Sequence, residues 1–122
     1  MHALVADDNA ICRDVAAAQL TLLGFRVTTA IDGDDALAAI DRHGRFDLIL
    51  VDWTMGPKNG RELIRQLRAL PDGHGTCICL WTGDATQERR DAAIHSGANA
   101  VLPKPFALGE LAAHLTQLGF RP

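Results

Sequence analysis

Residues that could do chemistry stand where short apolar runs of this sequence end. Two runs end in carboxylates, one in a hydroxyl and one near an ammonium group: Asp7 and Asp8 follow Ala3–Ala6, Asp52 follows Leu48–Val51, Thr82 ends 76–82, and Lys104 lies just beyond Asn99–Leu102. Short runs rich in branched aliphatic residues are typical of strands buried on both faces of a parallel sheet. Because ligands bind beyond the carboxyl ends of such strands, we expect these side chains to line one crevice.

Three carboxylates in one crevice require a cation. At a separation of about 4 Å, two like charges repel by roughly 4 kcal/mol at an effective dielectric constant near 20. Carboxylate oxygens without cysteine or histidine ligands favour Mg²⁺, which also accepts phosphate oxygens, and Mn²⁺ is expected to substitute for it. Lys104 adds a charge that can meet a phosphoryl oxygen, and Thr82 adds a hydroxyl donor.

Taken singly, each of these residues also fits an ordinary structural role. Asp7-Asp8 fits a helix-capping pair, and Asp52 fits a solvated strand end. Thr82 fits a turn residue, and Lys104 fits a surface charge. They give no reason for all five residues to fall at one edge of a sheet, so we favour a functional site.

Five strand and helix pairs must position this edge. The strands are predicted at 3–6, 25–30, 48–51, 76–82 and 99–102, each followed by a helix. The first four helices are predicted to begin at the capping residues Asn9, Asp32, Asn59 and Asp84, whereas Ala107 is a poor cap for the last. In the first helix, apolar residues recur at helical spacing, at Ile11, Val15, Ala18 and Leu22.

Repeated strand and helix pairs with short connections require right-handed crossovers and a parallel sheet covered on both faces. The predicted fold class is therefore α/β, a flavodoxin-like doubly wound sheet of five parallel strands in the order 2-1-3-4-5, with five helices. The 122 residues fit a single domain over 1–122, as a complete protein or an excised module.

Composition excludes several function classes. The net charge is −3 and the basic residues are scattered, which argues against direct nucleic-acid binding. No stretch approaches the roughly 20 apolar residues of a membrane span, and the N-terminus lacks a signal-peptide pattern, so we expect a cytoplasmic protein without membrane contact. The histidines are expected at the surface or at helix ends and the cysteines as reduced, buried thiols: His2, His43, His74, His95 and His114, and Cys12, Cys77 and Cys79.

These residues, in their order along the chain, resemble the receiver domain of two-component response regulators over essentially the whole length. The matching motifs are Asp7-Asp8, Asp52, Met55, Gly60, Thr82-Gly83 and Lys104-Pro105-Phe106. Any one motif alone is weak, whereas the ordered set is highly specific.

The resemblance implies a role for each matching position. Asp52 would be the phosphoacceptor, which attacks the phosphorus of a phosphohistidine. Asp8, Asp52 and the backbone carbonyl of Thr54 would ligate Mg²⁺, with Asp7 acting largely through water. Mg²⁺ and Lys104 would neutralise charge on the transferring phosphoryl group, and Thr82 would then move toward its oxygens.

The implied partner is a histidine kinase or a histidine phosphotransfer domain. In the family the first helix commonly meets this partner, which would bring Ile11 and Cys12 near it. The chain would catalyse only the phosphorylation and dephosphorylation of its own Asp52, and would not be an enzyme acting on other substrates.

The sequence also departs from the family pattern. Val101 stands where receivers often carry Tyr or Phe, so the last strand lacks the ring that swings inward with Thr82. Gly56 stands where the family usually has Pro, and Pro57 follows it. The bond between Lys104 and Pro105 is commonly cis in the family.

The two tryptophans are predicted to differ in environment. Trp53 follows Asp52 and should lie near the metal site, where its fluorescence would report binding. Trp81 precedes Thr82 and alternation sends it to the opposite face of the strand, into the core.

Three function classes follow from these residues. We favour a phosphorylatable signalling module, in the context of a hybrid kinase or relay rather than a single-domain or transcription-factor receiver. A binding-only pseudo-receiver is a second class, against which Asp8, Asp52 and Lys104 count. A Mg²⁺-dependent phosphatase of related topology is the third, but its usual second catalytic aspartate is replaced by Thr54.

Overall fold

Strands and helices alternate along the chain, as the sequence pattern predicts. The computed structural model describes residues 1–55, 58–71, 73–104 and 107–121. The strands are β1 (His2–Ala6), β2 (Arg26–Ala30), β3 (Leu48–Asp52), β4 (Thr54–Met55), β5 (Lys58–Asn59), β6 (Cys77–Thr82) and β7 (Ala100–Pro103). The helices are α1 (Ala10–Leu22), α2 (Gly33–His43), α3 (Gly60–Ala69), α4 (Gln87–Ser96) and α5 (Leu108–Gln117), with a 3₁₀ turn η1 at Gly73–Gly75.

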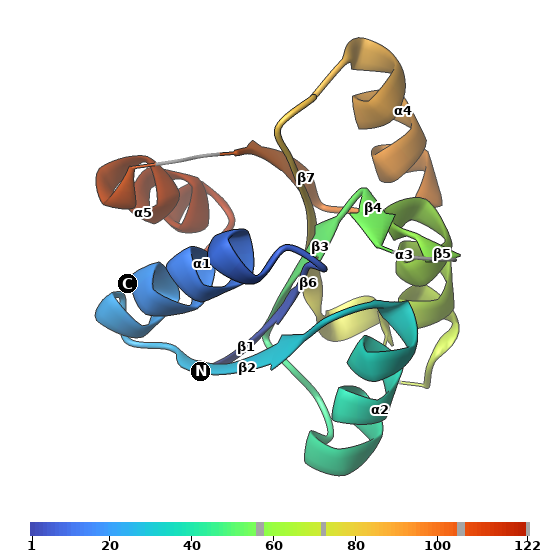
Figure 1. Cartoon of the computed structure of the whole chain (residues 1–122), viewed down its shortest axis with the longest axis horizontal. Coiled ribbons are helices and arrows are strands. Elements are labelled where there is room, and N and C mark those ends of the chain that lie inside the picture. The colour runs from blue at the N-terminus through green and yellow to red at the C-terminus, as the bar shows by residue number, and fades with distance from the viewer. Residues whose placement is uncertain (56–57, 72, 105–106, 122) are drawn as a thin grey trace.

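The five longer strands form one parallel sheet in the order β2-β1-β3-β6-β7. Counted along these five strands, the order is 2-1-3-4-5, which confirms the predicted flavodoxin-like fold. Helices α1 and α5 cover one face of the sheet, and α2, α3 and α4 cover the other (Figure 1). Because the five strands are parallel, their carboxyl ends all lie at the same end of the sheet, which we call the carboxyl edge. This edge carries the residues singled out above.

The central strand β3 is buried on both faces. Leu48 and Leu50 belong to the apolar cluster under α1 and α5, whereas Ile49 and Val51 belong to the cluster under α2, α3 and α4. This alternation follows from the two-residue period of a strand. It fixes which face Asp52 shares, because Asp52 continues the series of Leu48 and Leu50.

Three of the predicted caps are confirmed. The side chains of Asn9, Asp32 and Asn59 accept hydrogen bonds from the amides of Cys12, Asp35 and Glu62. No side chain caps α5 at Ala107; the Glu110 carboxylate accepts instead from the Ala107 amide at 3.3 Å.

The predicted cap of α4 at Asp84 is wrong. The Thr86 hydroxyl accepts from the Arg89 amide at 3.2 Å, and α4 begins one residue later. Asp84 is part of the preceding loop, because its own amide donates to the Thr82 hydroxyl at 3.2 Å. Two capping residues two positions apart compete here, and the tie to Thr82 selects the second.

Helix α1 is confirmed, but the residues that recur at helical spacing in it do not form its packed face. Ile11, Val15 and Leu22 are 76%, 49% and 74% exposed, whereas Ala16 and Leu20 are fully buried. The alanine-rich helix has apolar residues on two faces, so helical spacing alone could not select between them. The small Ala16 lets the helix approach the sheet, and the larger residues form an apolar stripe on the outside.

The predicted surface position of His2 is wrong as well, because His2 is only 8% exposed at the start of β1. Its Nδ1 lies 3.2 Å from Arg26 Nη2, and its Nε2 lies 2.7 Å from the Thr28 hydroxyl. Arginine only donates hydrogen bonds, so Nδ1 accepts and Nε2 carries the ring proton. Burial, then Arg26 and His43, lower the pKa of His2, against the opposing effect of Asp47.

The cysteines are free thiols, with Cys79 buried and Cys12 and Cys77 half-buried. Among the helices in the described parts of the chain, none has the length and apolar character that crossing a bilayer requires. The predictions on Gly56, Pro57 and the Lys104–Pro105 bond concern residues outside the described ranges and stay predictions.

The neutral state of His2 predicts a pH dependence of stability. The unfolded chain takes up a proton near the ordinary pKa of 6.5, whereas folded His2 does so only at lower pH. The free energy of unfolding should therefore fall as the pH drops below about 6.5. Thermal unfolding of the wild type and of His2→Gln, between about pH 7.5 and about pH 5, should show a smaller loss in the variant. Equal losses would contradict this assignment; His95→Gln, at an exposed position on α4, is the control.

Candidate functional site

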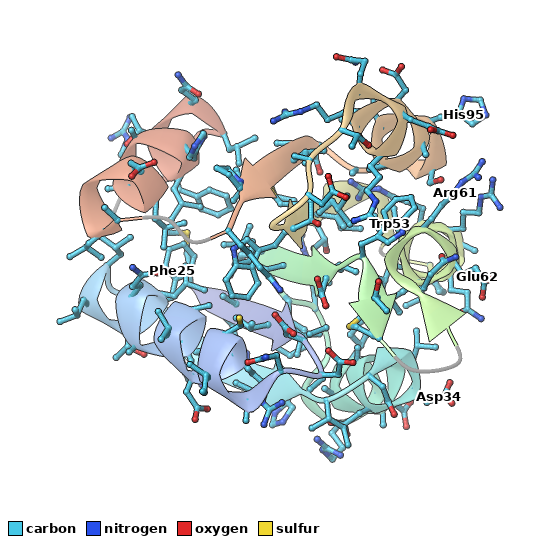
Figure 2. All side chains as sticks on the ribbon, turned by 45° about the horizontal axis from the view of Figure 1, so that its top comes forward. Phe25, Asp34, Trp53, Arg61, Glu62 and His95 are labelled. Carbon is cyan, nitrogen blue, oxygen red and sulfur yellow. The ribbon has the colours of Figure 1, made fainter. Side chains whose placement is uncertain are left out.

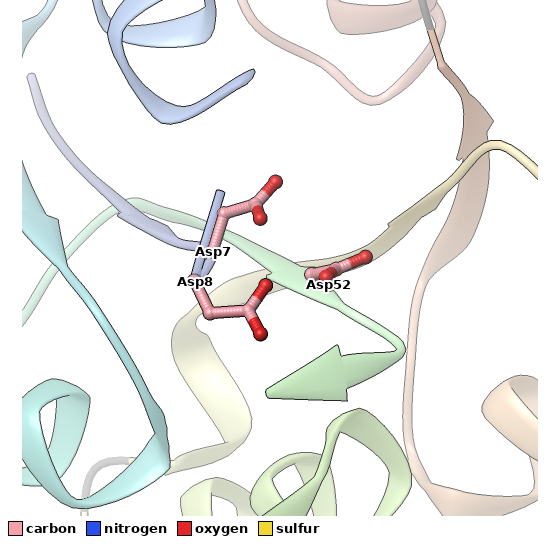
Figure 3. Close-up of side chains that lie close together, drawn as sticks. All are labelled: Asp7, Asp8 and Asp52. Carbon is pink, nitrogen blue, oxygen red and sulfur yellow. The ribbon is translucent and has the colours of Figure 1, made fainter. Parts of the chain in front are cut away.

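Three carboxylates converge at the carboxyl edge of the sheet. One oxygen from each of Asp7, Asp8 and Asp52 lies within 4.8 Å of the other two (Figure 3). Asp7 is fully buried, Asp52 is partly buried and Asp8 is exposed, so the cluster opens toward solvent on the Asp8 side. No other metal-binding group of this kind occurs among the described residues.

The strand register explains why these residues meet. Ala6 of β1 pairs with Val51 of β3, and Asp7 and Asp52 are the next residue of each strand. Asp7 remains in the sheet, because its amide donates to Ala30 of β2 at 3.1 Å. Its carboxylate accepts from the Asn9 amide at 2.9 Å, so the loop into α1 fixes its orientation.

Lys104 provides the positive charge of this edge. Its Nζ lies 2.6 Å from Asp7 Oδ2 and 3.1 Å from Asp52 Oδ1. Its side chain is 13% exposed, and its backbone amide donates to the Thr82 carbonyl at 2.9 Å, which continues the pairing of β7 with β6. One ammonium group therefore neutralises part of the charge of three carboxylates.

Burial and neighbouring charges shift both partners of this ion pair. Burial raises the pKa of Asp52, and the charge of Asp7 adds to the rise, against the opposing effect of Lys104. Burial lowers the pKa of Lys104, but its hydrogen bond to Asp7 and the charge of Asp52 outweigh that effect and raise it. Lys104 is thus held as an ammonium ion, whereas the carboxylates retain an excess of like charge.

The remaining predicted site residues lie around this centre. Thr82 is 4% exposed at the end of β6, and its hydroxyl accepts from the Asp84 amide. Among the described residues, the Thr82 hydroxyl forms no hydrogen bond to the side chain of Asp52 or Lys104. Thr54 is exposed in the short hairpin of β4 and β5, which follows Asp52 directly and was not predicted from the sequence.

Gly60, the first residue of α3 after the hairpin, has no room for a side chain. The Gly60 amide donates to the Trp53 carbonyl at 2.7 Å, which closes the hairpin onto the end of β3. A Cβ at this position would clash with the backbone carbonyl of Asp52 and lie 3.1 Å from its carbonyl carbon. The first residue of α3 therefore packs directly on the backbone of Asp52, and a larger residue would displace it.

Sequence reasoning did not identify Arg89. Its guanidinium lies 5.2 Å from the centroid of the Trp53 ring, and Trp53 lies between the hairpin and helices α3 and α4 (Figure 2). Arg89 also pairs with Asp84 at 3.8 Å. The contact between Trp53 and Arg89 joins two segments far apart in the sequence, and no local pattern marks it.

The donor set fits a hard divalent cation. The group offers carboxylate oxygens only, without nitrogen or sulfur ligands, and its excess negative charge favours a cation. Asp8 forms no salt bridge or hydrogen bond among the described residues and faces the open side, so it is available as a ligand. The acidic cluster thus fits Mg²⁺.

The doubly wound fold places the chain among flavodoxin-like α/β proteins, and the comparison with known families is more specific. The family model of the response regulator receiver domain matches residues 3–116. The chain belongs to this family, whose members serve in two-component systems.

Relatives include receivers from two kinds of protein. The sensor protein EvgS of Escherichia coli (strain K12) is 35% identical over 117 residues, which cover 94% of this chain and 9% of that protein. The response regulator MprA of Mycobacterium leprae (strain TN) is 36% identical over 118 residues, which cover 97% of this chain and 50% of that protein. The chain therefore spans half or less of the length of these relatives.

Solved structures agree with this assignment. The chemotaxis protein CheY4 of Vibrio cholerae superimposes with a TM-score of 0.89 at 30% identity, covering 95% of this chain and 96% of that one. The receiver domain of the sensor histidine kinase PA1611 of Pseudomonas aeruginosa PAO1 gives 0.85 at 34% identity, covering 95% and 94%. The latter structure has a magnesium ion coordinated in its active-site cleft.

Repulsion within the cluster predicts that Asp8→Asn stabilises the protein in the absence of divalent cations. Removing one charge from the group should raise the free energy of unfolding by about 1 kcal/mol, measured by urea denaturation in EDTA. Mg²⁺ at about ten times its dissociation constant should add about 1.4 kcal/mol to the wild type and little to the variant. Asp14→Asn, exposed on α1 outside the cluster, is the control. A less stable Asp8→Asn protein would contradict the repulsion.

Proposed function

We propose that this chain is a phosphoacceptor receiver of a two-component phosphorelay, in which Asp52 takes a phosphoryl group from a phosphohistidine. The observation that carries the proposal is the Lys104 ammonium 3.1 Å from Asp52, at an edge where three carboxylates meet. A carboxylate nucleophile next to a cation site and a lysine fits phosphoryl transfer, in which catalysis is mostly positioning and electrostatics.

In the proposed reaction, an Asp52 oxygen forms a bond to the phosphorus of the donor. The bond between phosphorus and the donor imidazole nitrogen breaks, and that nitrogen keeps the electron pair. Lys104 turns from the carboxylates to a phosphoryl oxygen and stays protonated throughout. The Thr82 hydroxyl, which accepts from the Asp84 amide, then moves to donate a hydrogen bond to a phosphoryl oxygen, which is the proposed switching step.

Asp8, Asp52 and the Thr54 carbonyl are the proposed ligands of Mg²⁺, with Asp7 acting through water and Mn²⁺ as a substitute. The bound ion would supply positive charge to the oxygens of the transferring phosphoryl group. Both oxygens of Asp7 are already engaged, one by Lys104 at 2.6 Å and the other by the Asn9 amide at 2.9 Å, which supports an indirect role for Asp7.

The context of the domain is also a proposal. We propose one receiver module over 1–122, cytoplasmic, without nucleic-acid or membrane contact of its own, that modifies only its own Asp52. The half-buried Val101 supports a hybrid-kinase or relay receiver, because it offers no aromatic ring for output through β7. A single-domain or transcription-factor receiver is the alternative, and the relatives include both a sensor protein and a response regulator.

Labelling with a small acyl phosphate tests the function. Incubation with acetyl phosphate and Mg²⁺ should add one phosphoryl group to the wild type, detected by intact mass spectrometry, and none to Asp52→Asn. Without a label on the wild type, the chain would be a binding-only pseudo-receiver. Multiple turnover on small phosphoesters would instead indicate a phosphatase.

We also propose that the site end of α1 docks the phosphohistidine partner. Ile11 is 76% exposed one turn from the acidic cluster, with the half-buried Cys12 beside it. Leu22 is 74% exposed at the other end of the helix, about 16 Å farther along its axis. The two positions are matched in exposure and differ in distance from Asp52.

The matched pair gives the test of docking. Ile11→Asp should slow transfer from a histidine phosphotransfer domain that labels the wild type by about tenfold, because it places a charge in an apolar contact. Labelling by acetyl phosphate should not change, and Leu22→Asp should leave both rates as they are. Equal effects of the two variants on transfer would refute docking at the site end.

A further inference from the structure

The path of the Lys104 side chain crosses a tryptophan. In the sheet order, β6 lies between β7, which leads into Lys104, and β3, which ends in Asp52. Asp52 pairs with Trp81, and Trp81 pairs with Leu102, so all three side chains are on the face covered by α1 and α5. To reach Asp52 from β7, the lysine must pass over Trp81.

The ring and the ammonium are in direct contact. Lys104 Nζ lies 4.4 Å from the centroid of the Trp81 ring. Trp81 is 3% exposed and is packed in the apolar cluster with Leu50, Leu102 and Leu111. The core therefore fixes the position of the ring, and one face of the ring contacts the ammonium group.

An indole face attracts a cation more strongly than any other side-chain ring does, and the attraction grows when water is excluded. An aliphatic residue at this position would give Lys104 an apolar contact without that attraction. The two carboxylates alone would then determine where the ammonium lies, and the charge at Asp52 changes as that residue is modified. Unlike the attraction of the Asp52 carboxylate, the attraction of the ring does not change when Asp52 is modified.

We propose that Trp81 is a positioning residue for Lys104. It keeps the ammonium over the end of β6 while Lys104 moves from Asp7 and Asp52 to an oxygen of the incoming phosphoryl group. This inference rests on the proposed function, because it assigns Trp81 a part in that same transfer. Trp81 does not touch the reacting atoms, and it acts through Lys104.

The graded test replaces the ring in two steps. Trp81→Phe keeps an aromatic face of weaker attraction, and Trp81→Leu removes it. The rate of Asp52 labelling by acetyl phosphate at saturating Mg²⁺ should fall by about threefold for Phe and about tenfold for Leu. Circular dichroism should confirm that each variant is folded at the assay temperature.

A matched core variant separates positioning from general destabilisation. Phe25 is also 3% exposed and belongs to the same apolar cluster, but it precedes β2, away from the carboxyl edge. Phe25→Leu should therefore label at the wild-type rate. Equal rates for the wild type and both Trp81 variants, or an equal loss in Phe25→Leu, would overturn the proposal.

A spectroscopic measurement tests the contact without any phosphoryl transfer. In a Trp53→Phe background, Trp81 is the sole tryptophan, and its emission should change on Lys104→Met because the adjacent charge is lost. Arg65→Met, exposed on α3, should leave the emission unchanged. Failure of the wild type to be labelled would reject the proposed function, whereas unchanged emission on Lys104→Met would reject the role of Trp81.

Discussion

The candidate site is defined by an excess of negative charge where the parallel strands of the sheet end. The parallel strands end side by side, and two of them deliver charged groups to the carboxylate of Asp52: β1, next to the central strand, leads into Asp7, and β7, two strands away, leads into Lys104. A single ammonium group balances only part of that charge, and burial makes the imbalance more costly. The excess negative charge at this edge therefore fits a divalent cation.

Most of the fold could be predicted because its signals are local. The caps at Asn9, Asp32 and Asn59 and the alternation of β3 each follow from a few adjacent residues. The strand order then follows from right-handed crossovers and chain length. The convergence of Asp7, Asp8 and Asp52 requires nothing beyond that order, which is why the sequence was sufficient to place these residues at one edge.

The sequence was not sufficient where two local arrangements, such as two helix faces or two capping residues, were both possible. The two apolar faces of α1 differ mainly in size, and the sheet selected the face with Ala16 rather than the larger Val15. Asp84 and Thr86 could both cap α4, and a hydrogen bond to Thr82 decided between them. Contacts such as Trp53 with Arg89 join distant segments, and a single sequence holds no signal for them.

Two features that local sequence patterns do not reveal bear on function: the exposed apolar residues of α1 and the ring of Trp81. The large apolar residues of α1 that do not pack form an external stripe beginning next to the acidic cluster. Val101 gives β7 no aromatic ring at this position. Trp81 instead contributes a ring from β6, in contact with the lysine that would sense the phosphoryl group.

The most direct test of the central claim is a crystal structure of the chain grown with Mg²⁺ and beryllium fluoride, which mimics an aspartyl phosphate. The account predicts a fluoroberyllate group on Asp52, a metal ion bound by Asp8 and Asp52, and Lys104 bound to a fluorine atom. An adduct formed with no metal ion in the acidic cluster, or with Lys104 still bound to Asp7 alone, would contradict it.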